Sequence, residues 1–152
     1  MLRLSRKAEY GLIALKYMLN RPPGTLCTSR EIAERFKIPE PLMAKILQKL
    51  VKDGLIMSTQ GVRGGYILAM PPERITVAKI VESIEGPFGI VDCVVSGEDC
   101  RCLQYDEGVC NIDESFASIQ IQFKHFLDGI SLADLNKPAA KVPQLVNIRV
   151  GV

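Results

Sequence analysis

The stretch from Asp92 to Asp113, DCVVSGEDCRCLQYDEGVCNID, constrains the fold most, because it has too few apolar residues to build a core of its own. It contains four of the five cysteines, and its residues follow neither the two-residue period of a strand nor the 3.6-residue period of a helix. Loops of this length are uncommon in compact domains unless they have a function. We therefore predict a cofactor loop, ordered by a bound metal or by a disulfide.

Three helices are predicted in the first 53 residues. Ser5 can cap the first helix, which ends near Asn20 before the sequence RPPG. Its apolar positions recur at three- and four-residue spacing: Ala8, Leu12, Leu15 and Leu19. Thr28 and Glu31 form the capping box of a short second helix, and a third helix is predicted over residues 41–53.

A hairpin follows, with strands predicted over 55–59 and 66–69 and the turn QGVRGG between them. Two short helices and a hairpin predict a winged helix-turn-helix, whose second helix enters the major groove of DNA. The residues expected to face DNA are Glu40, Pro41, Ala44, Lys45 and Gln48 on the helix and Gln60 and Arg63 on the wing. The alternative is an ordinary three-helix core whose lysines are only solvated.

The charge distribution favours the DNA-binding interpretation. Residues 1–75 contain 13 Lys and Arg against six Asp and Glu, whereas residues 76–152 contain six against 11. The basic half could meet a polyanion such as duplex DNA.

The N-terminus, MLRLSRKAEYGL, lacks the features of a signal peptide, and no apolar run is long enough to span a membrane. We therefore expect a cytoplasmic protein without a membrane partner. In that reducing compartment clustered cysteines more often bind metal or sense redox state than form permanent disulfides.

A long helix is predicted after the loop. Six apolar residues recur in steps of three and four: Ile112, Phe116, Ile119, Phe123, Phe126 and Ile130. This seam predicts a dimerisation helix, although it could instead cover the protein's own body. The chain thus divides into a winged helix-turn-helix domain (1–85), a cysteine-rich loop (86–111), a dimerisation helix (112–135) and a tail (136–152). The expected fold is mainly α with a small β-hairpin.

The sequences LRLSRKAEYGLIAL and GLIMSTQGVRGGYILA, a helix starting at Thr76 and the cysteine-rich loop together resemble the IscR/NsrR-type family of winged-helix transcription regulators. The resemblance covers the chain to about Leu135. It implies a homodimer that binds a palindromic operator in double-stranded DNA. It also implies an iron-sulfur cluster, [2Fe-2S] or [4Fe-4S], that tunes DNA affinity.

The cysteines depart from that family's pattern, which has three in this loop. Cys93 and Cys110 match the outer positions, but Cys100 and Cys102 compete for the middle one. Spacing alone does not choose the metal, so a structural zinc or unliganded thiols remain alternatives.

The fourth ligand also stays open. Cys100 and Cys102 could both bind, across the single residue between them. By the resemblance, Glu9 aligns with a first-helix acidic position that supplies a carboxylate from the opposite subunit in some relatives. Asp113 stands where some relatives have a histidine.

Three functions are therefore considered: a cluster-sensing regulator, a clusterless regulator switched by thiol chemistry or a partner, and an iron-sulfur carrier without a DNA role. An enzyme is not expected, since His125 is the only histidine and therefore the only candidate for the base of a Ser-His or Cys-His hydrolytic site. Cys27 is expected to be a small buried hydrophobe.

Overall fold

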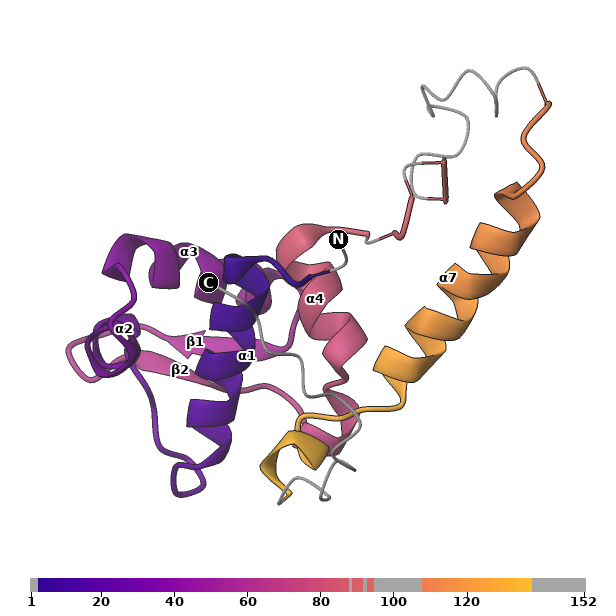
Figure 1. Cartoon of the computed structure of the whole chain (residues 1–152). Coiled ribbons are helices and arrows are strands. Elements are labelled where there is room, and N and C mark those ends of the chain that lie inside the picture. Colours follow the sequence, from indigo (N-terminus) through magenta and orange to yellow (C-terminus); the bar gives the residue numbers. More distant parts are fainter. Residues whose placement is uncertain (1–2, 88, 92, 95–107, 138–152) are drawn as a thin grey trace, which may run out of the picture.

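The computed structural model describes residues 3–87, 89–91, 93–94 and 108–137. The helices are α1 (Arg6–Leu19), α2 (Ser29–Phe36), α3 (Glu40–Lys52), α4 (Val77–Glu85) and α7 (Asp113–Asp128), and the strands are β1 (Ile56–Thr59) and β2 (Gly65–Leu68). Single 3-10 turns lie at Pro72–Arg74 and Asp134–Asn136. Figure 1 shows α1 to α4 and the hairpin as one body, residues 3–85, which we call the head, with α7 projecting from it. The expected mainly α fold with a hairpin is confirmed.

Hydroxyl caps set where three of the helices begin. The side chains of Ser5, Thr28 and Thr76 each accept the main-chain N–H three residues further on, over 3.2, 3.1 and 3.3 Å. Such caps satisfy main-chain donors that the first turn of a helix leaves unpaired. The helix starts predicted from these residues are therefore confirmed.

Glu31 has a second role besides its place in the capping box. The Tyr17 hydroxyl and the Arg21 guanidinium both donate hydrogen bonds to its carboxylate, which joins the end of α1 to α2. The bond from Tyr17, together with the charge of Arg21, lowers the pKa of Glu31. Arg21 stacks over the Tyr17 ring at 4.8 Å, and the Phe36 ring meets it edge-on at 5.6 Å.

The head is held by one main apolar core in which α1, α3 and α4 pack closely. Its largest fully buried side chains include Leu15, Ile32, Met43, Leu47, Leu50, Ile56, Ile80 and Ile84. At Gly11 an added Cβ would lie 2.1 Å from Cδ1 of Ile84. Glycine at this position thus allows α1 and α4 to approach each other.

The hairpin pairs Ile56 with Leu68 and Thr59 with Gly65 in antiparallel register. A single further bridge joins Tyr66 to Cys27, with N···O distances of 2.9 and 2.8 Å. The segment before α2 therefore supports the outer side of β2, which the sequence did not predict. Cys27 is fully buried, as expected, and burial raises the pKa of its thiol.

The C-terminal end of α7 is attached to the head by the main chain. Val77 N–H donates to Ile130 O at 2.9 Å, and Leu132 N–H donates to Ile75 O at 2.7 Å. Leu132 itself is fully buried in the head's core. The helix ends at Asp128 with Gly129 as its C-cap, so Ile130, the last residue of the predicted seam, belongs to this attachment. No helix in the described ranges is both long enough and apolar enough to cross a membrane.

The contact at Gly11 generates a stability prediction. Gly11→Val should lower the free energy of unfolding by roughly 1–3 kcal/mol, because the added carbons overlap Ile84 and force α1 and α4 apart. Lys7→Val, at an exposed position of the same helix, is the control and should change it by less than about 0.5 kcal/mol. Urea unfolding monitored by circular dichroism measures both, and equal effects would show that the close approach does not matter.

Candidate nucleic-acid interface and cysteine segment

A groove with a volume of about 520 Å³ lies between α3 and the hairpin. Gln48 of α3 and Gln60 of the hairpin turn both line it, together with Ser29 at the start of α2. The structure thus brings together two predicted DNA-facing residues that are separated by a strand in the sequence. We call this groove the wing groove.

The exposed face of α3 is the one that the sequence predicted. Pro41, Lys45 and Gln48 are exposed, as is Glu40, whereas Ala44 is half-buried. Lys45 forms no ion pair within the described part of the chain. This face is therefore available to contact the major groove of DNA, where side-chain hydrogen bonds read base edges.

Lys49 lies on the same helix but serves the fold. Its Nζ donates a hydrogen bond to the Ile84 carbonyl oxygen of α4 at 2.6 Å. The basic residues of α3 are therefore not equivalent: Lys45 is directed to solvent, and Lys49 ties α3 to α4. Of these two lysines, only Lys45 is among the residues that the sequence predicted to face DNA.

Arg63 lies in the exposed turn of the hairpin. The turn needs glycine because Gly61 has a φ of +116°, and because an added Cβ at Gly64 would lie 2.4 Å from Thr59 O. A narrow turn that presents one cation is suited to a backbone phosphate or the minor groove.

Sequence reasoning missed the start of α2 as part of this surface. Thr28 and Ser29 line the wing groove, and the free main-chain N–H groups of a helix N-terminus suit phosphate. The capping box gave the position of the helix start. Only the fold shows that this start faces the hairpin.

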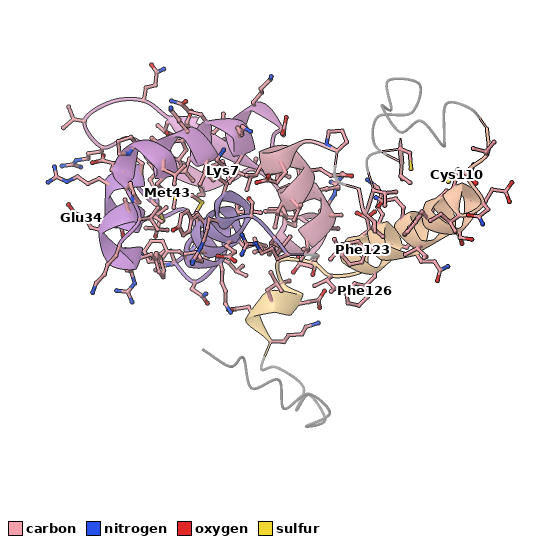
Figure 2. All side chains as sticks on the ribbon, turned by 45° about the horizontal axis from the view of Figure 1, so that its top comes forward. Lys7, Glu34, Met43, Cys110, Phe123 and Phe126 are labelled. Carbon is pink, nitrogen blue, oxygen red and sulfur yellow. The ribbon has the colours of Figure 1, made fainter. Side chains whose placement is uncertain are left out.

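Of the four loop cysteines, the structure describes two. Cys93 and Cys110 are both half-buried, whereas Cys100 and Cys102 lie outside the described residues. Figure 2 shows Cys110 beside the end of α7 that lies away from the head. Half-buried thiols at the two ends of the segment are soft donors of the kind that iron-sulfur clusters and zinc prefer.

The two carboxylate alternatives lie on different elements. Glu9 on α1 forms an ion pair with Arg6 at 3.6 Å. Asp113 is the first residue of α7 and is half-buried. Among the described residues of this single chain, no three His, Cys, Asp or Glu side chains come together as a metal site.

The apolar seam of α7 divides between two faces. Phe123 and Leu127 line a hollow against Val81 of α4, so this part covers the protein's own body. Ile119 and Phe126 instead remain 49% and 63% exposed. Figure 2 shows Phe123 and Phe126 near the end of α7 that meets the head. The seam thus covers the protein's own body at Phe123, whereas Ile119 and Phe126 stay exposed in the single chain.

The comparisons with known proteins agree with this geometry. Residues 4–138 match the Rrf2 family, described as iron-dependent transcriptional regulators. A protein of Aquifex aeolicus (strain VF5), named as an HTH-type transcriptional regulator, is 33% identical over 132 residues, which cover 86% of this chain and 89% of that protein.

Two solved structures are similar throughout most of the chain. CymR (YrzC), the global cysteine regulator of B. subtilis, is 27% identical with a TM-score of 0.67, covering 89% of this chain and 96% of its own. T. potens IscR is 28% identical with a TM-score of 0.64, covering 88% and 85%.

The helix-turn-helix, its exposed α3 face and the wing groove define a winged-helix DNA-binding protein. Within that class, the chain belongs to the Rrf2 family of transcriptional regulators. The predicted family is thus confirmed, and so is the expectation that the protein is a regulator and not an enzyme. The family therefore rules against a carrier without a DNA role.

The difference between Lys45 and Lys49 can be tested by salt dependence. Lys45→Ala should reduce the slope of log binding constant against log salt concentration by about 0.9, because one phosphate contact is lost. Lys49→Ala should leave the slope unchanged and lower the unfolding temperature instead, because it removes the hydrogen bond to Ile84. Fluorescence anisotropy on a labelled duplex measures the slope. Equal slopes for Lys45→Ala and the unaltered protein would remove Lys45 from the interface.

Proposed function

We propose that the chain acts in the cytoplasm as a homodimeric regulator that binds a palindromic operator and that its cysteine segment holds an iron-sulfur cluster. The observation that carries the proposal is the arrangement along α7: its base is joined to the DNA-binding head, and Cys110 lies beside its other end. A change at the cysteines therefore acts on the same rigid helix that meets the head.

The homodimer is supported by the exposed apolar face of α7. None of the 16 residues of this helix is buried in the single chain. Ile119 and Phe126 lie on one side, and covering a large apolar side chain is favourable by about 1.5–3 kcal/mol. Two copies of this face would place two heads on one operator, and a two-fold symmetric dimer matches a palindromic site.

The cluster is supported by its donors and by the family. Thiolates are the usual ligands of iron-sulfur clusters, which supply a redox-sensitive and oxygen-sensitive group when bound. Cys93 and Cys110 would be two of the ligands, with Cys100, Cys102, Glu9 and Asp113 as the candidates for the others. The family's description as iron-dependent regulators is consistent with this donor set.

A clusterless regulator is the second candidate. The observation that favours it is the likeness to CymR, the global cysteine regulator of B. subtilis. In that case the thiols of Cys93 and Cys110 would change DNA binding by their own oxidation or by the binding of a partner.

A matched pair of substitutions tests the dimer. Ile119→Asp should convert the dimer to monomers, because it places a charge in the apolar face. Ile121→Asp should leave the dimer intact, since Ile121 lies two residues further on, on a different side of α7, and is 59% exposed in the single chain. Sedimentation equilibrium distinguishes the two. If both variants remain dimers, or both dissociate, this face of α7 is not the interface.

Anaerobic purification tests the cluster. The unaltered protein should show visible absorption, which Cys93→Ala and Cys110→Ala should each abolish because each removes a thiolate ligand. Only one of Cys100→Ala and Cys102→Ala should do the same if a single middle cysteine binds. Cys27→Ala is the control, because that thiol is buried in the head and should leave the absorption unchanged. A colourless protein whose DNA affinity changes with thiol oxidation would instead establish the clusterless regulator.

A further inference from the structure

We propose that Gln120 is a positioning residue for metal binding, which holds the beginning of the cysteine segment against α7. The inference rests on the proposed metal-binding role of that segment and concerns a residue that is not itself a ligand. Its side chain acts through the main chain just before Cys93.

The contact is a hydrogen bond between residues 89–91, which we call the linker, and the middle of α7. Ile90 N–H donates to Gln120 Oε1 at 3.0 Å, and both residues are half-buried. Three residues later the chain reaches Cys93, inside a turn closed by Val94 N–H donating to Val91 O at 3.2 Å. The path of the main chain into Cys93 is therefore fixed from α7.

The other end of the segment is fixed by the same helix. Cys110 lies three residues before Asp113, where α7 begins. Gln120 lies seven residues further along, which corresponds to about 10.5 Å at the rise of an α-helix. One rigid element thus holds both flanks of the segment at a set separation. Ligands held in this way lose less conformational freedom when a metal binds.

Packing around the linker supports this role. Gly89 and Ile90 line the same hollow, of about 630 Å³, as Phe123 and Leu127 on α7 and Val81 on α4. The linker therefore follows the flank of α7 that faces the head. Lys124, the residue after Phe123, forms an ion pair with Glu82 of α4, so this side of the helix is also joined to the head.

The hydrogen bond from Ile90 requires an oxygen at position 120 that accepts it. Glutamate keeps that acceptor and the length of the side chain, whereas alanine removes both. Gln122, two residues further on, provides a matched control. It is exposed, and its Nε2 donates to the Ser118 hydroxyl within α7 at 3.3 Å.

The experiment is an anaerobic titration of metal-free, reduced protein with Co²⁺, followed by the thiolate-to-cobalt absorption band. Gln120→Ala should bind Co²⁺ about 10–100-fold more weakly than the unaltered protein, the usual effect of losing a group that orients a metal ligand. Gln120→Glu should restore binding. Gln122→Ala and Gln122→Glu should bind normally, and the latter controls for the added charge. Thermal unfolding and sedimentation should be the same for all variants.

Unchanged Co²⁺ affinity in Gln120→Ala would overturn the inference, as would a Gln120→Glu variant as weak as Gln120→Ala. A wild-type protein with no thiolate-to-cobalt band would overturn it too, while leaving the dimer and DNA assays to judge the regulator separately. Conversely, Gln120→Ala could bind Co²⁺ more weakly, as expected, in a protein whose DNA affinity is the same with and without metal. That result would support the inference and refute the proposed metal-controlled function.

Discussion

The attachment of α7 to the head is the interaction on which the rest of the arrangement depends. Two main-chain hydrogen bonds join residues 75–77 to residues 130–132, and Leu132 is buried in the head's core immediately beside them. Burying such a side chain contributes about 1.5–3 kcal/mol, so the base of α7 is fixed by the core itself. The remainder of the helix projects from the head and presents its exposed face (Figure 1).

This attachment explains how one small chain can connect three surfaces. The exposed α3 face and the wing groove belong to the head, the apolar face with Ile119 belongs to the projecting helix, and Cys110 lies beside its far end. Because a helix is rigid over this length, displacement of one end changes the angle at the other. The proposed control of DNA binding requires such a coupled element, with two arrangements that metal binding favours unequally.

Local features were predictable from the sequence. The caps at Ser5, Thr28 and Thr76 act within four residues, and the glycine-rich turn determines the hairpin by its own backbone conformation. The predicted DNA-facing residues were placed on an exposed surface for the same reason, because a helix period fixes which side chains share a face.

What the sequence did not predict depends on distant segments. The bridge between Cys27 and Tyr66, the hydrogen bond from Lys49 to Ile84 and the burial of Leu132 each join residues at least 35 positions apart. The sequence predicted the apolar seam of α7, but its periodicity does not distinguish Phe123, which covers the head, from Phe126, which faces solvent. The Gln120 contact was likewise missed, since an isolated glutamine on a helix carries no sequence signal.

Control of DNA binding by the cysteine segment can be tested by measuring the affinity for DNA with the cluster bound and without it. An operator selected from random-sequence duplexes can be titrated by fluorescence anisotropy with cluster-loaded and with metal-free protein, under anaerobic conditions at one salt concentration. If the cluster controls DNA binding, the two dissociation constants should differ by about 5–150-fold, the usual range of coupling between two sites. Equal dissociation constants, with the cluster shown to be bound in the loaded sample, would contradict it.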